Sequence, residues 1–289
     1  MTIKEIFTKL SDIQKEFKMK TDKLKELKEL LSIPSSTWEE DMVISYLLGV
    51  CDEKGYHYDV DDMGNVYITK GSSDNYPLVL AHTDTVHSLC EMYVNEELQP
   101  NAQGDMKLSL KAYRKDNGLP TGIGGDDKAG VFICLQLLER FENIKAFFPV
   151  AEEIGCKGSL KADEEFFQDV GYAIQFDSTE NDTMSLSLMG TQLFEYESDF
   201  FKKSKSIITE HGITEWKHHP YTDAMVLSQK FSFACFNFAA GYYRYHTSEE
   251  YVVVDDVVNS TNLGESLIKE LGEEHYQYEP QSNSKYSWF

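Results

Sequence analysis

Hydrophobic side chains recur along the chain at two spacings, and the two patterns alternate. Apolar residues three and four positions apart among lysines and glutamates predict amphipathic helices, whereas short apolar runs between turn residues predict buried strands. The expected helices cover residues 3–32 (one or two helices, with a break near 19–21), 37–53, 126–141, 199–212 and 260–274. The expected strands lie within residues 56–71, 77–86, 145–153, 170–178, 183–198 and 231–246, and residues 91–120 are expected to form a hairpin or a long loop.

Strands that alternate with helices predict an α/β fold: a single three-layer domain in which helices flank a mostly parallel, twisted sheet. We expect this domain to cover residues 21–275, after an amino-terminal helical extension at 1–20 and before a polar tail at 276–289. In parallel sheets, ligand sites form beyond the carboxyl ends of the strands. Polar residues at strand ends are therefore the first candidates for a functional site.

The composition of the chain excludes some classes of binding partner for the protein. The net charge of -22 argues against nucleic-acid binding. No stretch reaches the ~20 apolar residues that span a bilayer, and the charged amino terminus lacks the apolar core of a signal peptide. The five cysteines stand at unrelated spacings, which predicts free thiols in a reducing compartment. We expect a cytoplasmic protein that binds neither nucleic acid nor membranes.

Four polar clusters stand where an expected strand ends: HTDT, AEEIG, FDS and YHTSEE. In the first, His82 and Asp84 are two positions apart, so their side chains point the same way. A carboxylate there is suited to hold the second nitrogen of a metal-binding histidine. Asp126 opens the helix after TGIGG, where backbone amides help to hold an anion.

The polar residues at these strand and helix ends form a set of nitrogen and oxygen donors without sulfur. Such a set suits a divalent metal ion, which can be Zn, Mn or Co. The candidates are His82, Asp84, Asp126, Asp127, Glu152, Glu153, Asp177 and His246. Each residue alone carries little weight, and their joint order along the chain is what indicates a metal site.

The stretches LAHTDTV, GIGGDDKAG, VAEEIG, IQFDS and YHTSEE follow one another in an order that resembles the dimetal (zinc) exopeptidases of the M20/M28/M42 group. The upstream stretches IPSSTWEE and DDMGNVYITKG also resemble that family, so that the likeness covers roughly residues 22–270. DDKAG and EEIG are most similar to peptidase T. The resemblance implies two divalent metal ions, Zn or alternatively Co or Mn.

The resemblance also implies a role for each ligand. His82 and Asp177 would bind one metal ion, Glu153 and His246 would bind the other, and Asp126 would bridge both. These five assignments follow from the family's motifs and not from spacing alone.

Two further roles follow from the same motifs. Asp84 would hold the imidazole of His82, and Glu152 would be the general base that acts on a metal-bridging water. Neighbouring residues at a strand end point in different directions, so one glutamate can bind a metal ion while the other reaches the water.

The chain departs from the M20 pattern in one respect. The interval from Asp177 to His246 is only 246 − 177 = 69 positions, and expected strands and a helix use most of it. A further domain needs at least ~50 residues, so we expect no inserted lid and no lid-mediated dimer. The oligomeric state stays open.

The favoured function is a metal-dependent aminopeptidase that acts on short peptides. A carboxypeptidase or an N-acyl amino acid amidohydrolase is the alternative, which Arg244 would favour if it faced the metal ions. A catalytically idle relative that serves as a binding module is a third reading, although every ligand and the base are in place.

Several polar residues near the motifs are expected to have structural roles. These are a helix-start charge for Asp127, a local ion pair for Lys128, a solvated position for His87, surface positions for His218 and His219, and a helix cap for Asp223. Glu249 and Glu250 are either solvated loop acids or acceptors for a substrate amino terminus.

Overall fold

The computed structural model describes residues 21–101, 103–188, 191–219 and 221–278. The predicted extension at 1–20 and most of the predicted tail lie outside these ranges, so both stay predictions. No helix among the described residues combines the length and the hydropathy needed to cross a bilayer.

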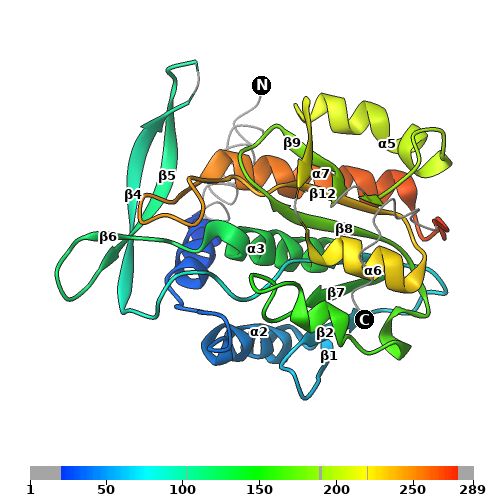
Figure 1. Ribbon diagram of the computed structural model, residues 1–289, viewed down its shortest axis with the longest axis horizontal. Coiled ribbons are helices and arrows are strands. Elements are labelled where there is room, and N and C mark those ends of the chain that lie inside the picture. The colour runs from blue at the N-terminus through cyan, green and yellow to red at the C-terminus, as the bar shows by residue number, and fades with distance from the viewer. Residues whose placement is uncertain (1–20, 102, 189–190, 220, 279–289) are drawn as a thin grey trace, which may run out of the picture.

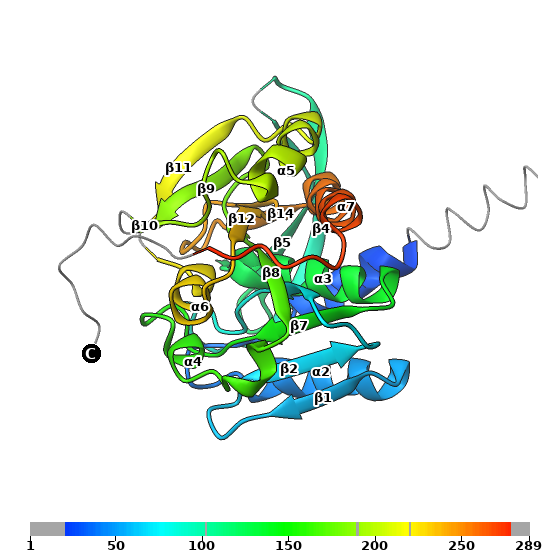
Figure 2. The ribbon, with the colours of Figure 1, turned by 90° about the vertical axis from the view of Figure 1, so that its right-hand side faces the viewer.

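A nine-stranded mixed sheet runs through the molecule (Figures 1 and 2). Its strands, in spatial order, are β1 (His57–Val60), β2 (Val66–Lys70), β7 (Ile144–Phe148), β3 (Tyr76–Leu80), β8 (Val170–Ser178), β12 (Cys235–Ala239), β9 (Thr183–Leu188) and β10 (Thr191–Gln192), with β11 (Glu215–His219) also paired to β9. The four central strands β7, β3, β8 and β12 are parallel. Antiparallel pairs extend the sheet on both sides, through β2 and β9. The predicted α/β class is confirmed. The sheet was predicted to be mostly parallel, and its four central strands are parallel.

Helices cover both faces of this sheet. They are a helical segment at 21–31, α2 (Asp41–Lys54), α3 (Gly125–Arg140), α4 (Lys157–Leu160), α5 (Asp199–Glu210), α6 (Asp223–Phe231) and α7 (Val254–Leu271), with a short 3-10 turn η1 (Glu165–Phe167). Figure 2 shows α3 and α7 on one side of the sheet and α4 and α6 on the other. Because both faces are covered, every residue of β3, β7 and β8 is buried.

Close packing of α7 on α3 depends on one glycine. A Cβ atom at Gly264 would lie 2.8 Å from Cδ1 of Leu137 and 2.8 Å from Cζ of Phe176. The helix can approach this closely only because residue 264 has no side chain.

A second, five-stranded sheet stands beside the first. It contains β13 (Tyr242–Tyr243), β14 (Tyr251–Val253), β5 (Met106–Arg114), β4 (Met92–Pro100) and β6 (Pro120–Thr121). Strands β4 and β5 form a long hairpin that projects from the body in Figure 1, which confirms the hairpin alternative for residues 91–120.

Candidate metal centre

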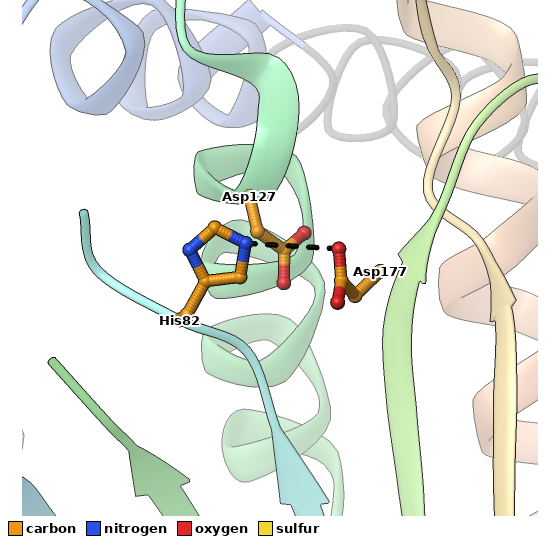
Figure 3. Close-up of side chains that lie close together, drawn as sticks. All are labelled: His82, Asp127 and Asp177. Carbon is orange, nitrogen blue, oxygen red and sulfur yellow. Dashed lines mark ion pairs between the residues drawn. The ribbon is translucent and has the colours of Figure 1, made fainter. Parts of the chain in front are cut away.

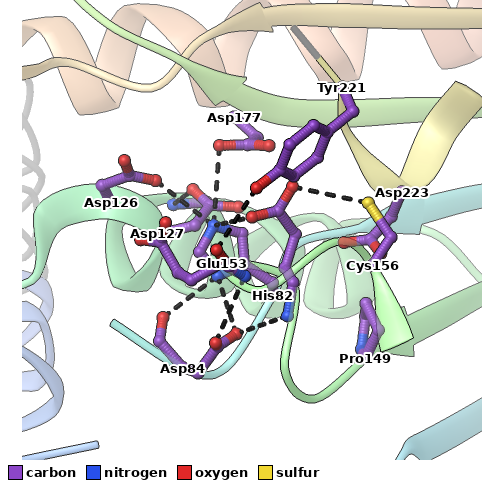
Figure 4. A network of polar contacts seen from close by, with 12 residues as sticks. His82, Asp84, Asp126, Asp127, Pro149, Glu153, Cys156, Asp177, Tyr221 and Asp223 are labelled. Atoms are coloured by element: carbon purple, nitrogen blue, oxygen red, sulfur yellow. Dashed lines mark hydrogen bonds and ion pairs between the residues drawn. The ribbon is translucent and has the colours of Figure 1, made fainter. Parts of the chain in front are cut away.

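The motif residues meet at the carboxyl ends of the parallel strands. His82 and Asp84 follow β3, Glu152 and Glu153 follow β7, and Asp177 lies near the end of β8. The start of α3 and the segment after β13 bring Asp126 and His246 to the same place, as the contacts of Asp126 with both histidines show. Figure 4 shows part of the network that these side chains form, with His82, Asp84, Asp126, Glu153 and Asp177 labelled. The fold therefore gathers all seven residues that the motifs singled out.

Asp126 lies between the two histidines. Its Oδ1 is 3.2 Å from Nε2 of His82, and its Oδ2 is 3.2 Å from Nε2 of His246. On the two outer sides, Oδ1 of Asp177 is 3.6 Å from Nε2 of His82, and Oε1 of Glu153 is 3.0 Å from Nε2 of His246. Both imidazoles thus contact Asp126, and each also contacts at least one further carboxylate.

Asp127 is also part of this site. It stands in the first turn of α3 but is completely buried, and it faces His82 and Asp177 (Figure 3). One of its oxygens accepts the amide of Gly130 at 3.1 Å, while Oδ2 has no hydrogen-bond partner among the described residues. Asp127 thus stands at the helix start as predicted, but its complete burial beside His82 and Asp177 was not predicted.

Asp84 holds both glutamates as well as the imidazole. Its Oδ1 is 3.3 Å from Nδ1 of His82 and accepts the amide of Glu152 at 2.9 Å. Its Oδ2 accepts the amide of Glu153 at 3.3 Å and the hydroxyl of Thr37 at 2.7 Å. The contact with His82 matches the prediction, whereas those with the two amides and Thr37 were missed because they join segments far apart in the sequence.

Burial and crowding shift the protonation of these groups. Burial raises the pKa of Glu152 well above its usual range, and burial together with nearby carboxylates raises the pKa of Asp177 to about 7. Hydrogen bonds to Asp126 and Glu153 raise the pKa of His246 to about 10. Burial alone would lower the pKa of His82, but its hydrogen bonds to carboxylates raise it well above the ordinary value.

The donor set fits divalent cations. One group of donor atoms that lie within 4.8 Å of one another comes from His82, Asp126 and Glu153, and a second comes from His82, Asp127 and Asp177. The carboxylates outnumber the imidazoles in a buried place, and bound cations offset such a surplus of negative charge. Imidazole and carboxylate donors suit Zn, Mn and Co.

A pocket opens onto this cluster. Its lining contains four carboxylates and one histidine (Asp126, Glu152, Glu153, Asp177 and His246), together with Ser178, Thr179, Tyr221, Thr222, Tyr242 and Tyr245. No lysine or arginine and no residue of the hairpin at 91–120 lines it within the described part of the chain. The lining therefore combines four carboxylates with three tyrosines.

Three polar residues near the motifs lie in surroundings that differ from those predicted. Lys128 is buried and donates to the carbonyl oxygens of Leu31 and Ile33 at 3.2 and 2.6 Å, so the predicted ion pair is wrong. His87 is largely buried rather than fully solvated, and its Nε2 lies 2.7 Å from Oε2 of Glu250. Glu250 is completely buried, so it is not a solvated loop acid either.

The remaining predictions have mixed outcomes. Asp223 is buried and accepts a hydrogen bond from the hydroxyl of Ser159 at 2.6 Å. It does not cap the helix as predicted, since α6 has no side-chain cap hydrogen bond. Glu249 is half exposed and pairs with Lys111 at 2.5 Å. His218 is exposed as predicted, and the side chain of His219 lies outside the described part of the structure. Arg244 is exposed and does not line the pocket.

No family model matches the chain. Over 180 residues the chain is 27% identical to the cytosol non-specific dipeptidase of Escherichia coli strain K12. This alignment covers 56% of the chain and 34% of the dipeptidase, so the chain spans about a third of the length of that curated relative.

Three solved structures share the fold. The aminopeptidase PepT of Bacillus cereus has a TM-score of 0.69 at 15% identity, over 87% of this chain and 98% of that chain. A tripeptidase of Staphylococcus aureus has a TM-score of 0.68 at 13% identity, over 86% and 98%. An aminopeptidase of the archaeon Desulfurococcus kamchatkensis has a TM-score of 0.63 at 16% identity, over 88% and 96%. The dipeptidase and all three structures carry the names of peptidases.

Proposed function

We propose that this protein is a peptidase that uses two divalent metal ions to release residues from the amino end of short peptides. The observation that carries the proposal is the position of Asp126, with one carboxylate oxygen 3.2 Å from each of the two histidines. A carboxylate placed in this way can bind two cations at once. The names of the similar proteins support peptide bonds as the substrate class.

Two ligand sets are proposed around Asp126. His82 and Asp177 would hold one ion, and Glu153 and His246 would hold the other. Nδ1 of His82 faces Asp84 while Nε2 faces the carboxylates, which is the orientation that a metal ligand needs. Zn, Co and Mn all suit this set.

Glu152 is the proposed general base. It is buried, it lines the pocket, and its Oε2 lies 3.9 Å from Nε2 of His82. When bound, the two cations would polarise the scissile carbonyl and lower the pKa of the attacking water. Glu152 accepts a proton from that water as the water oxygen bonds to the carbonyl carbon. It then delivers this proton to the amine nitrogen, which leaves when the C–N bond breaks.

The charge of the pocket favours the amino end of a peptide over the carboxyl end. Recognition of a terminal carboxylate needs a cationic partner such as arginine, and the pocket lining contains neither arginine nor lysine among the described residues. Arg244, which would favour a carboxypeptidase, is exposed and outside the lining. A protonated amino terminus is compatible with the acidic wall.

We also propose that the protein acts as a single three-layer domain without an inserted lid. The interval between Asp177 and His246 contains β9, β10, α5, β11, α6, β12 and β13, which pair in the two sheets or pack on them. The described part of this interval has no room for a further domain. Substrate contacts and a dimer that depend on a lid are therefore not expected.

The test is hydrolysis of Ala-Ala-Ala and of an N-acetylated dipeptide by protein loaded with Zn, Co or Mn. The same protein treated with a chelator is the control. Metal-dependent cleavage of the tripeptide alone is expected. Cleavage of the acetylated substrate would shift the function to a carboxypeptidase or an N-acyl amino acid amidohydrolase. Cleavage of neither substrate, with two ions bound, would favour an idle relative that serves as a binding module.

A further inference from the structure

Glu250 is a buried carboxylate that contacts the loop in front of Asp126. We propose that Glu250 is a positioning residue: it fixes the backbone that carries Asp126, and so sets where the shared carboxylate lies between the two histidines. His87 completes this arrangement by holding Glu250. The inference rests on the proposed metal site, and it adds Glu250 and His87 as residues that hold the ligand Asp126 in place.

The contacts of Glu250 go to backbone amides on both sides of Gly125. Oε1 accepts the amide of Asp126 at 3.1 Å, and Oε2 accepts the amide of Gly124 at 3.0 Å. Oε2 also lies 2.7 Å from Nε2 of His87. A carboxylate that accepts from two amides of one turn fixes both the position and the orientation of that turn. The anion held by the amides of Gly124 and Asp126 is thus the carboxylate of Glu250.

The glycines of this loop permit the close approach. A Cβ atom at Gly125 would lie 3.3 Å from Oε1 of Glu250, and one at Gly122 would lie 2.0 Å from the ring of His87. Gly124 has a φ of 65°, in the left-handed region that glycine adopts without strain. The loop is therefore shaped to wrap around the Glu250–His87 pair.

Glu250 reaches this place from the second sheet. It directly precedes β14, where Val252 pairs with Leu110 of β5. Its side chain is completely buried, and a buried charge without partners would be costly. The two amides and His87 supply those partners. It stands four positions after His246, so one short segment supplies a candidate ligand and a support for the shared carboxylate.

The experiment compares Glu250→Gln with the neighbouring Glu249→Gln. Glutamine has one acceptor oxygen and one NH2 donor, so one amide of the loop would face a donor instead of an acceptor. Glu249 is its matched control, because it is half exposed and pairs with Lys111 away from the loop. Metal-free forms of both variants and of the original chain are titrated with Co²⁺, and binding is followed by the visible absorption of the ion. Thermal unfolding of the metal-free forms checks that each variant folds.

The expected result is a ~10–100-fold loss of Co²⁺ affinity in Glu250→Gln, the range typical for residues that support metal ligands. Glu249→Gln is expected to bind like the original chain. Equal affinities in Glu250→Gln and the original chain would overturn the inference while leaving the metal site intact. Failure of the original chain to bind Co²⁺ would instead overturn the proposed function, and this inference with it.

If Glu250→Gln does not fold, two variants of His87 decide the question. His87→Leu removes the donor that holds Glu250, and it is expected to weaken Co²⁺ binding. His87→Gln retains a donor and is expected to restore most of the affinity. Equal affinities in the two variants would then overturn the inference.

Discussion

Replacing Asp84 by asparagine tests whether one buried carboxylate holds both glutamates of the site. Asp84 is completely buried and accepts hydrogen bonds from the amides of Glu152 and Glu153 and from the hydroxyl of Thr37. Asparagine has nearly the same shape but carries one acceptor oxygen and one NH2 donor. The substitution therefore changes the hydrogen bonding with little change in volume.

The cost follows from the two ways in which the new amide group can lie. With NH2 in place of Oδ2, the Thr37 hydroxyl can turn to accept, but the Glu153 amide loses its acceptor. With NH2 in place of Oδ1, the Glu152 amide loses its acceptor and the NH2 also faces Nδ1 of His82, which lies 3.3 Å from Oδ1. Either way, one hydrogen bond to a charged group is lost, at ~1.5–3 kcal/mol, and one amide is left unsatisfied. We expect the free energy of unfolding to fall by about 2–4 kcal/mol.

The assay is urea unfolding of the metal-free protein at pH 7, so that metal binding does not contribute to the difference. Asp62→Asn is the matched control, because Asp62 is exposed and the variant loses the same charge. The control is expected to change the free energy of unfolding by less than ~0.5 kcal/mol. A loss in Asp84→Asn no larger than in the control would refute the reasoning, since the contacts of Asp84 would then contribute nothing to stability.

Five other changes have expected outcomes. Glu152→Gln should lower kcat about 100- to 10,000-fold with unchanged metal content, measured by steady-state kinetics and metal analysis; metal loss in this variant would mean that the two glutamates have exchanged roles. Gly49→Ala should stabilise the protein by ~0.5–1 kcal/mol, because a Cβ atom there meets nothing within 4 Å inside α2. Gly264→Ala in α7 should destabilise the protein by ~1–3 kcal/mol in the same urea assay, because a Cβ atom there would lie 2.8 Å from Leu137 and Phe176. Equal effects of Gly49→Ala and Gly264→Ala would contradict the close packing of α7 on α3. Burial alone would raise the pKa of Glu139, but hydrogen bonds from two lysines lower it below the ordinary 4.5. Glu139→Gln should therefore cost ~0.5–1 kcal/mol at pH 7, and this difference should vanish as the pH falls below 4.5 through the lowered pKa; a difference that is independent of pH would contradict the assignment. Removal of metal by a chelator should abolish hydrolysis, and an ion at 100 times its Kd should raise the free energy of unfolding by ~2.7 kcal/mol, seen as a higher Tm on adding the ion back.

Periodicity was sufficient to predict the α/β class and the strand ends as the place of the site. The apolar runs at β3, β7 and β8 are buried on both faces, as uninterrupted hydrophobic stretches in a sheet centre require. The antiparallel pairing of β9 with β12 was not predictable in this way. Strand direction depends on the path of the chain between strands, and a local pattern contains no record of that path.

The sequence by itself determined which residues could bind metal ions, because their chemical types and order are written in the chain. Only the tertiary structure decided which of two adjacent glutamates, Glu249 or Glu250, lies against the loop that carries Asp126. Glu249 and Glu250 have the same side chain, yet one pairs with Lys111 while the other is buried against the amides before Asp126. Both residues precede β14, so which of them faces the loop depends on how β14 pairs with β5. That pairing joins residues more than 130 positions apart, so no local feature of the sequence specifies it.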